Sequence, residues 1–119
     1  MTLDDLKWEY RVILYFPVDG ESSLILNDSI NQEIQERKIA YFIFGDSVVS
    51  NIETSFSPTY LKQIENKYKM GYKGSMYVLL GLDGGVKLRE EDSVDWDHVF
   101  QTIDAMPMRQ SEKKKGSNK

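Results

Sequence analysis

The chain has 119 residues and a mass of 13.8 kDa, which leaves room for one domain around a single hydrophobic core. Its net charge of −4 argues against a general nucleic-acid-binding protein, and no apolar run approaches the roughly 20 residues that a membrane span needs. No cysteine is present, so thiol redox chemistry and disulfide bonds are excluded.

Two apolar runs in the N-terminal half predict buried strands. Arg11–Phe16 and Ile39–Phe44 are rich in β-branched and aromatic residues and lack strict alternation, which is typical of strands covered on both faces. The segment between them is long enough for a helix, so the two strands are expected to be parallel and joined by a right-handed crossover. Residues 46–56 mix apolar and polar residues and leave open an extended segment or a loop.

Helices are expected after each of these strands. Ser22 or Ser23 can cap the first, whose apolar stripe consists of Leu26, Ile30 and Ile34. The second begins with Ser57 as its cap and Pro58 in its first turn, and Gly71 provides a left-handed exit. Its inward stripe consists of Leu61, Ile64 and Tyr68.

A hairpin and a closing helix follow. Met76–Leu80 predicts a third strand, and Asp83, Gly84 and Gly85 form a tight-turn signal that leads into an alternating edge strand at residues 86–89. Ser93 is the expected cap of the last helix, which Pro107 ends. The apolar stripe of that helix consists of Trp96, Val99, Phe100, Ile103 and Met106.

This succession predicts an α/β fold of the order β-α-β-α-β-β-α. A parallel strand pair joined to an antiparallel hairpin is the thioredoxin-like topology, with a mixed four-stranded sheet in the order 2-1-3-4 flanked by helices. Residues 1–109 are expected to form this domain, and residues 110–119 a basic polar tail without fixed structure, because the tail has few apolar groups to offset its ordering entropy.

The carboxyl ends of parallel strands are where such sheets place a ligand crevice. Here the predicted crevice consists of Pro17, Asp19, Glu21, Ser22, Ser23, Asp46 and Ser47. The serines lack an adjacent general base, since the one histidine, His98, belongs to the last helix. The sequence therefore predicts no catalytic residue and no cofactor.

An alternative hypothesis is a metal-assisted enzyme. Asp19, Glu21 and Asp46, together with Ser47, could supply oxygen ligands to a hard cation, although their spacing matches no calcium loop. The interpretation that these are ordinary surface carboxylates at strand ends is favoured, and no metal site is predicted.

The C-terminal end of the last helix offers a candidate docking surface. Met106, Met108 and Arg109 combine flexible apolar side chains with a fixed positive charge. The structural alternative, which is favoured, has Arg109 folding back onto the last helical carbonyls or onto Asp104. Of the two tryptophans, Trp96 is expected to anchor the core and Trp8 to cover one end of it.

Three segments together resemble the DUDES family: KWEYRVILYF at residues 7–16, GLDGGVKLR at residues 81–89 and IDAMPMRQSE at residues 103–112. This domain of unknown function is shared by vertebrate extracellular proteins, among them Equarin and sushi-repeat-containing proteins, and by short bacterial proteins. The resemblance implies a thioredoxin-like, peroxiredoxin-related fold without catalytic cysteines, and it brings no established activity. Leu82 departs from the family pattern at a turn position where a basic residue is expected.

The sequence thus favours a non-catalytic thioredoxin-like module that binds a protein or a small ligand, with neither nucleic acid nor membrane insertion, and with homo-oligomerisation left open. The acidic N-terminal residues do not form a signal peptide. A cytoplasmic location is expected if the chain is full length, and a secreted or periplasmic one if a signal was removed.

Overall fold

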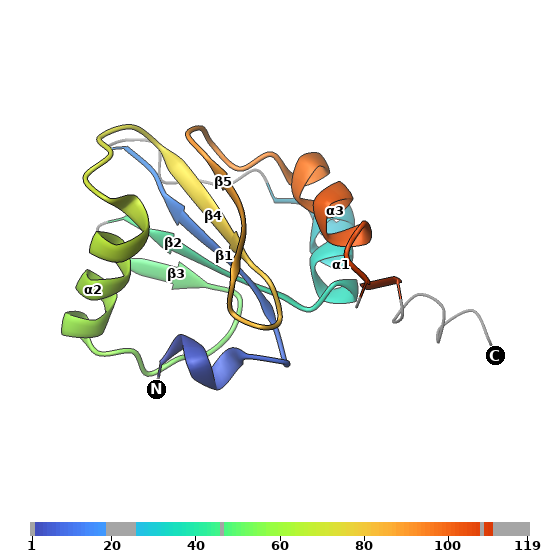
Figure 1. The fold of residues 1–119 in the computed structure, drawn as a ribbon, viewed down its shortest axis with the longest axis horizontal. Coiled ribbons are helices and arrows are strands. Elements are labelled where there is room, and N and C mark those ends of the chain that lie inside the picture. The colour runs from blue at the N-terminus through green and yellow to red at the C-terminus, as the bar shows by residue number, and fades with distance from the viewer. Residues whose placement is uncertain (1, 19–25, 46, 108, 111–119) are drawn as a thin grey trace.

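A computed structural model describes residues 2–18, 26–45, 47–107 and 109–110 (Figure 1). Among these residues, no helix combines the length and apolar character that crossing a membrane requires. The elements in chain order are η1 (Leu3–Leu6), β1 (Arg11–Phe16), α1 (Asp28–Glu36), β2 (Ile39–Phe44), β3 (Val48–Ser50), α2 (Pro58–Lys69), β4 (Met76–Leu80), β5 (Val86–Glu90) and α3 (Trp96–Asp104).

The sheet is mixed and has five strands in the order β3-β2-β1-β4-β5. The parallel pairing of β1 with β2 is confirmed, and so is the antiparallel hairpin of β4 and β5. The expected number of four strands is wrong, because Val48–Ser50 pairs antiparallel with the end of β2 and adds an edge strand. This three-residue strand falls in the segment for which the sequence left strand and loop open.

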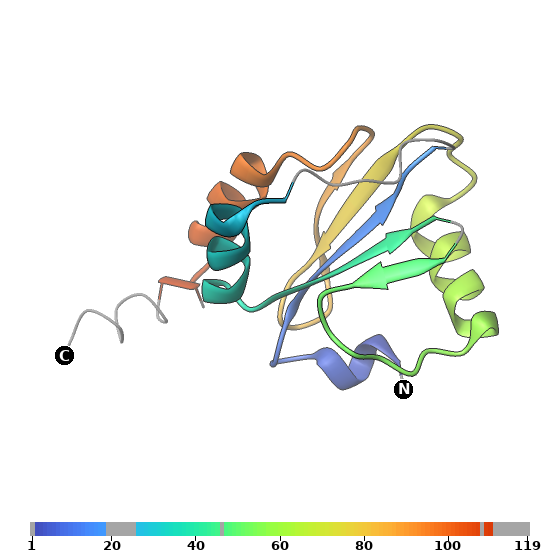
Figure 2. The ribbon, with the colours of Figure 1, turned by 180° about the vertical axis from the view of Figure 1, so that it is seen from behind.

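Both faces of the sheet are covered, which explains the continuous burial of β1. Val12, Leu14 and Phe16 belong to the core cluster under η1 and α2. Ile13 and Tyr15 belong to the cluster under α1 and α3. Seen from the two opposite sides, α1 and α3 lie together on one face of the sheet while α2 and η1 lie on the other (Figures 1 and 2).

Two of the three expected helix caps are wrong, because other residues cap α1 and α3. The described part of the first helix begins at Asp28, and its cap is Asn27, whose side chain accepts from the Ile30 N–H at 2.8 Å. Ser22 and Ser23 lie outside the described residues. In α3 the cap is Asp95 rather than Ser93, because Asp95 accepts from the His98 N–H at 3.2 Å and caps as well as serine does.

Helix α2 keeps its predicted start and shifts its end. Ser57 accepts from the Tyr60 N–H at 3.1 Å, and Pro58 occupies the first turn, as expected. The left-handed exit begins one residue early, at Met70 with φ of 51°, and continues at Gly71 with φ of 78°. Gly71 can adopt this conformation without the steric cost that Met70 bears.

Tyr77 on β4 gives the fold a measurable dependence on alkaline pH. Burial raises the pKa of its hydroxyl from 10.0 to about 12, and the nearby backbone N–H of Asp95 offsets only part of the rise. Between these values the folded protein keeps a proton that the unfolded chain has lost. The free energy of unfolding should therefore fall by about 2 to 3 kcal/mol as pH rises from about 10 to 12.

Urea unfolding at several alkaline pH values measures this loss. Tyr77→Phe removes the titrating group, so the variant should lose less stability than the parent protein over the same range. A variant whose stability falls as steeply as that of the parent would contradict the role of Tyr77.

Candidate functional site

The candidate site is a cavity of about 360 Å³ between η1, α2 and the end of the sheet where β1 begins and β4 ends. We call it the tyrosine pocket. It lies at the opposite end of β1 from the crevice that the sequence predicted. Its lining residues are Leu3, Asp4, Leu6, Lys7, Tyr10, Val12, Tyr60, Gln63, Ile64, Lys67, Tyr68, Leu80, Gly81 and Gly84.

The floor of the tyrosine pocket is apolar and buried. Leu6, Val12, Ile64 and Leu80 line it, and each is at most 3% exposed. They come from η1, β1, α2 and β4, so four elements converge on the same volume. Side chains packed this tightly by separate elements keep a preformed shape, which is usual for small-molecule sites.

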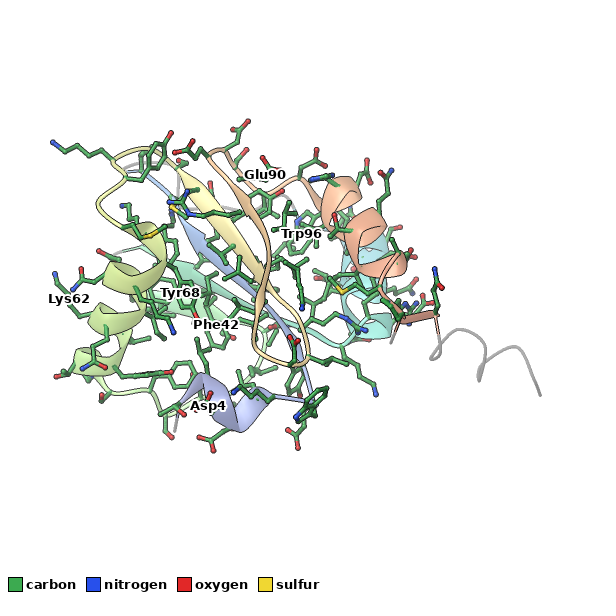
Figure 3. The ribbon with its side chains drawn as sticks, viewed as in Figure 1. Asp4, Phe42, Lys62, Tyr68, Glu90 and Trp96 are labelled. Carbon is green, nitrogen blue, oxygen red and sulfur yellow. The ribbon has the colours of Figure 1, made fainter. Side chains whose placement is uncertain are left out.

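Tyrosines and lysines form the walls above this floor. Tyr60 on α2 fixes the start of η1, since its hydroxyl accepts from the Leu3 N–H at 2.8 Å. Tyr68 lies on the side of α2 that faces the sheet, and the Lys67 Nζ lies 5.2 Å from the centre of its ring (Figure 3). On the facing wall, Lys7 Nζ pairs with Asp4 Oδ1 at 3.1 Å. The pocket therefore offers apolar, aromatic and cationic contacts together.

The turn between β4 and β5 closes one side. Gly84 has a φ of 82° and donates its N–H to the Gly81 carbonyl at 3.0 Å, as the tight-turn signal predicted. A Cβ built on Gly84 would lie 2.6 Å from Lys7 Cε, so the glycine lets the lysine stem lie against the turn. Leu82 is only 7% exposed, which explains why an apolar residue suits this turn position.

The sequence predicted that Trp8 covers one end of the core. This prediction is wrong, because Trp8 is 61% exposed. Leu6 covers that end instead, at 3% exposure. The Trp8 N–H donates to the Leu82 carbonyl at 2.8 Å, and its φ of 69° puts it in the left-handed region, which costs a non-glycine residue roughly 1 to 2 kcal/mol. Trp96 is 6% exposed, and its predicted role as a core anchor is confirmed.

The predicted crevice is described only in part. Pro17 follows β1 and Ser47 precedes β3, while Asp19, Glu21, Ser22, Ser23 and Asp46 lie outside the described residues. The Val18 N–H donates to Ser75 Oγ at 3.0 Å, which ties the segment after β1 to the segment before β4. Pro17 and Val18 also line a shallow hollow beside Lys69, Tyr72 and Lys73. The crevice stays a prediction.

The metal hypothesis stays a prediction for the same reason, since Asp19, Glu21 and Asp46 lie outside the described residues. Within the described ranges, no group of three or more histidines and carboxylates lies close enough to hold a metal ion. His98 is on the helix surface, as expected, but it has a neighbour: its Nε2 lies 3.4 Å from Glu90 Oε1 on β5.

Of the candidate docking residues, Arg109 belongs to a buried ionic cluster. Arg109 is 4% exposed, and its guanidinium donates to Asp104 Oδ1 at 3.3 Å and to Glu36 Oε1 at 3.0 Å. The prediction that Arg109 folds back onto Asp104 is thus confirmed. Met106 is half-buried against the core under α1 and α3, and Met108 lies outside the described residues. A docking role for this surface stays a prediction.

Arg37, which the sequence analysis did not single out, completes this cluster. Its guanidinium makes two bonds to the Asp104 carboxylate, of 3.0 and 2.8 Å, and also pairs with Glu33. Burial lowers the pKa of Arg37, but the bonds and charges of Asp104 and Glu33 outweigh this effect, so the pKa is raised. We call Arg37, Asp104 and Arg109 the arginine clasp, because one carboxylate joins the ends of α1 and α3.

In the tyrosine pocket, the sequence analysis missed Lys7, Lys67 and Tyr60. Tyr68 and Ile64 were assigned only to a core stripe, and the structure confirms that they face the core under α2. A usable signal was present in α2, where Tyr60, Ile64, Lys67 and Tyr68 recur at helical spacing and so share a face.

Comparison with known proteins places the chain in a family but assigns no activity to it. No curated protein and no solved structure matches the chain. A family model matches residues 2–112, which include the tyrosine pocket and the arginine clasp. The chain therefore belongs to the family described as Domain of unknown function (DUF4174).

Proposed function

We propose that this domain is a non-catalytic binding module on a thioredoxin-like scaffold and that it holds a small molecule in the tyrosine pocket. The strand order β2-β1-β4-β5, with β1 and β2 parallel and the other pairs antiparallel, supports the thioredoxin-like assignment. In this view β3 is an addition at the edge. The DUDES-like segments agree with this assignment, and the same resemblance implies a peroxiredoxin-related fold.

The tyrosine pocket is the observation that carries the proposed function. Its volume of about 360 Å³ falls within the range of about 300 to 1,000 Å³ that is usual for small-molecule sites. Its aliphatic floor and the tyrosine rings above it favour an apolar group, and the polar and charged side chains of its lining can orient a ligand. The chemistry of the chain favours binding over catalysis, because it has no cysteine and its one histidine, on α3, pairs with Glu90.

Nuclear magnetic resonance tests the proposal with a library of small aromatic and aliphatic compounds added to isotope-labelled protein. Ligands should shift the amide signals of Leu6, Lys7, Tyr68, Gly81 and Gly84, which surround the tyrosine pocket. Shifts that gather instead around residues 17–18 and 72–73 would assign binding to the other end of the sheet and contradict the proposal.

A matched pair of variants on α2 tests whether ligands bind in the tyrosine pocket. Gln63 is exposed and lines the tyrosine pocket, whereas Lys62 is exposed and points away from the sheet (Figure 3). Gln63→Trp should fill part of the opening and weaken ligand binding by about tenfold, or ~1.4 kcal/mol. Lys62→Trp carries the same bulk on the outer face, so it should leave the affinity unchanged.

A further inference from the structure

The charge of the tyrosine pocket differs in sign from that of the whole protein. Its lining holds two lysines and one aspartate, a balance of +1, in a chain whose net charge is −4. Local charge of one sign in a concave site raises the local concentration of the opposite ion. The pocket can therefore attract an anion although the protein as a whole is acidic.

The two lysines occupy different walls. Lys7 follows η1 and lies against the β4–β5 turn, while Lys67 belongs to α2. The pairing of Lys7 with Asp4 is exposed, with 41% and 79% of the two side chains accessible. Ion pairs this exposed are weak, so an incoming anion can take over Lys7 at little cost. Both lysines line the same pocket, so an anionic group at its opening is attracted by both positive charges.

The apolar part of the pocket lining indicates that the ligand has an apolar body besides its anionic group. Leu6, Val12, Ile64 and Leu80 are already buried, so an apolar body would gain mainly from contact with the half-buried side chains above them. The rings of Tyr10, Tyr60 and Tyr68 add aromatic surface between the floor and the lysines.

We infer that the ligand of the tyrosine pocket is a small amphipathic organic anion, an inference that rests on the proposed binding function. Its apolar body lies against the tyrosine rings above the aliphatic floor, and its anionic group lies between Lys7 and Lys67.

A series of three compounds with one apolar body separates charge from shape: phenylpropionate, phenylpropanol and phenylpropylamine. Binding is measured by amide shift titration of the full chain at low salt, where interactions between exposed charges are least screened. The acid should bind about tenfold more tightly than the alcohol, because a charge-assisted hydrogen bond is stronger than a neutral one, and the amine should bind most weakly.

Two variants should move the affinity for phenylpropionate in opposite directions. Lys67→Glu should weaken it by about tenfold or more, and Asp4→Asn should strengthen it severalfold by freeing Lys7. Lys62→Glu changes net charge equally on the outer face of the same helix and should have little effect (Figure 3).

The outcomes distinguish this inference from the proposed function. Equal affinity of acid and alcohol at the pocket residues overturns the preference for anions and leaves the binding function in place. An equal loss of affinity for phenylpropionate in Lys62→Glu and Lys67→Glu shows an effect of net charge and also overturns the inference. If none of the three compounds shifts the pocket residues but other library compounds do, the ligand class is wrong; if nothing does, the binding function itself falls.

Discussion

Asp104→Ala should lower the free energy of unfolding by about 3 to 5 kcal/mol, because it leaves two buried guanidinium groups without their shared carboxylate. Arg37 and Arg109 are 7% and 4% exposed, and both donate to Asp104. Arg109 would keep Glu36, and Arg37 would keep Glu33, but both of these carboxylates lie nearer the surface. The loss is large against the roughly 5 to 15 kcal/mol by which a domain is stable.

Urea unfolding followed by circular dichroism measures this loss. Asp97→Ala is the matched control, since Asp97 is exposed in the first turn of the same helix. Its removal should cost at most about 1 kcal/mol through the helix dipole. Equal losses for the two variants would show that Asp104 acts only as a surface carboxylate, and the clasp would not stabilise the fold.

Trp96→Ala should be about as damaging, with a loss of about 3 to 5 kcal/mol, because it opens a cavity in the core under α3. The Trp96 ring packs edge-on against Tyr41 at 6.4 Å and stacks on Phe100 at 5.7 Å. Phe100 in turn lies beneath the Arg37 guanidinium at 4.6 Å. The substitution therefore also loosens the aromatic support of the arginine clasp.

Trp8→Ala makes the same chemical change at a residue that is 61% exposed, so its effect should stay within about 0.5 kcal/mol. Trp96→Phe provides a milder step if the alanine variant fails to fold. Within the described part of the chain the Trp96 Nε1 has no hydrogen-bond partner, so phenylalanine keeps most of the packing and loses no such bond. Equal stability of the two alanine variants would contradict the role of Trp96 as an anchor.

Much of the scaffold could be predicted because its signals are local. The continuous apolar run of β1 predicts a strand covered on both faces, and its burial follows from that position. Ser57 and Pro58 mark the start of α2 through their own backbone chemistry. The edge strand β3 could not be assigned in the same way, because its three residues gain strand structure only by pairing with β2.

The candidate site could not be predicted by the same means. Lys7 and Lys67 are 60 positions apart in the sequence, and each by itself reads as an ordinary surface lysine. The crevice hypothesis followed the rule for parallel strands, yet the cavity with an apolar floor lies at the other end of β1. Two of the four elements that make this floor are η1 and α2, and no local pattern specifies their positions against the sheet.

The sequence by itself determined that this protein has no thiol chemistry, that β1 lies inside the sheet, and that α2 starts at Ser57, because composition, periodicity and capping act within one segment. Only the tertiary structure decided that Asp104 serves both Arg37 and Arg109, and that four elements enclose the tyrosine pocket. The reason is physical: a buried charge or a cavity is defined by groups from distant segments whose approach depends on the packing of the whole core.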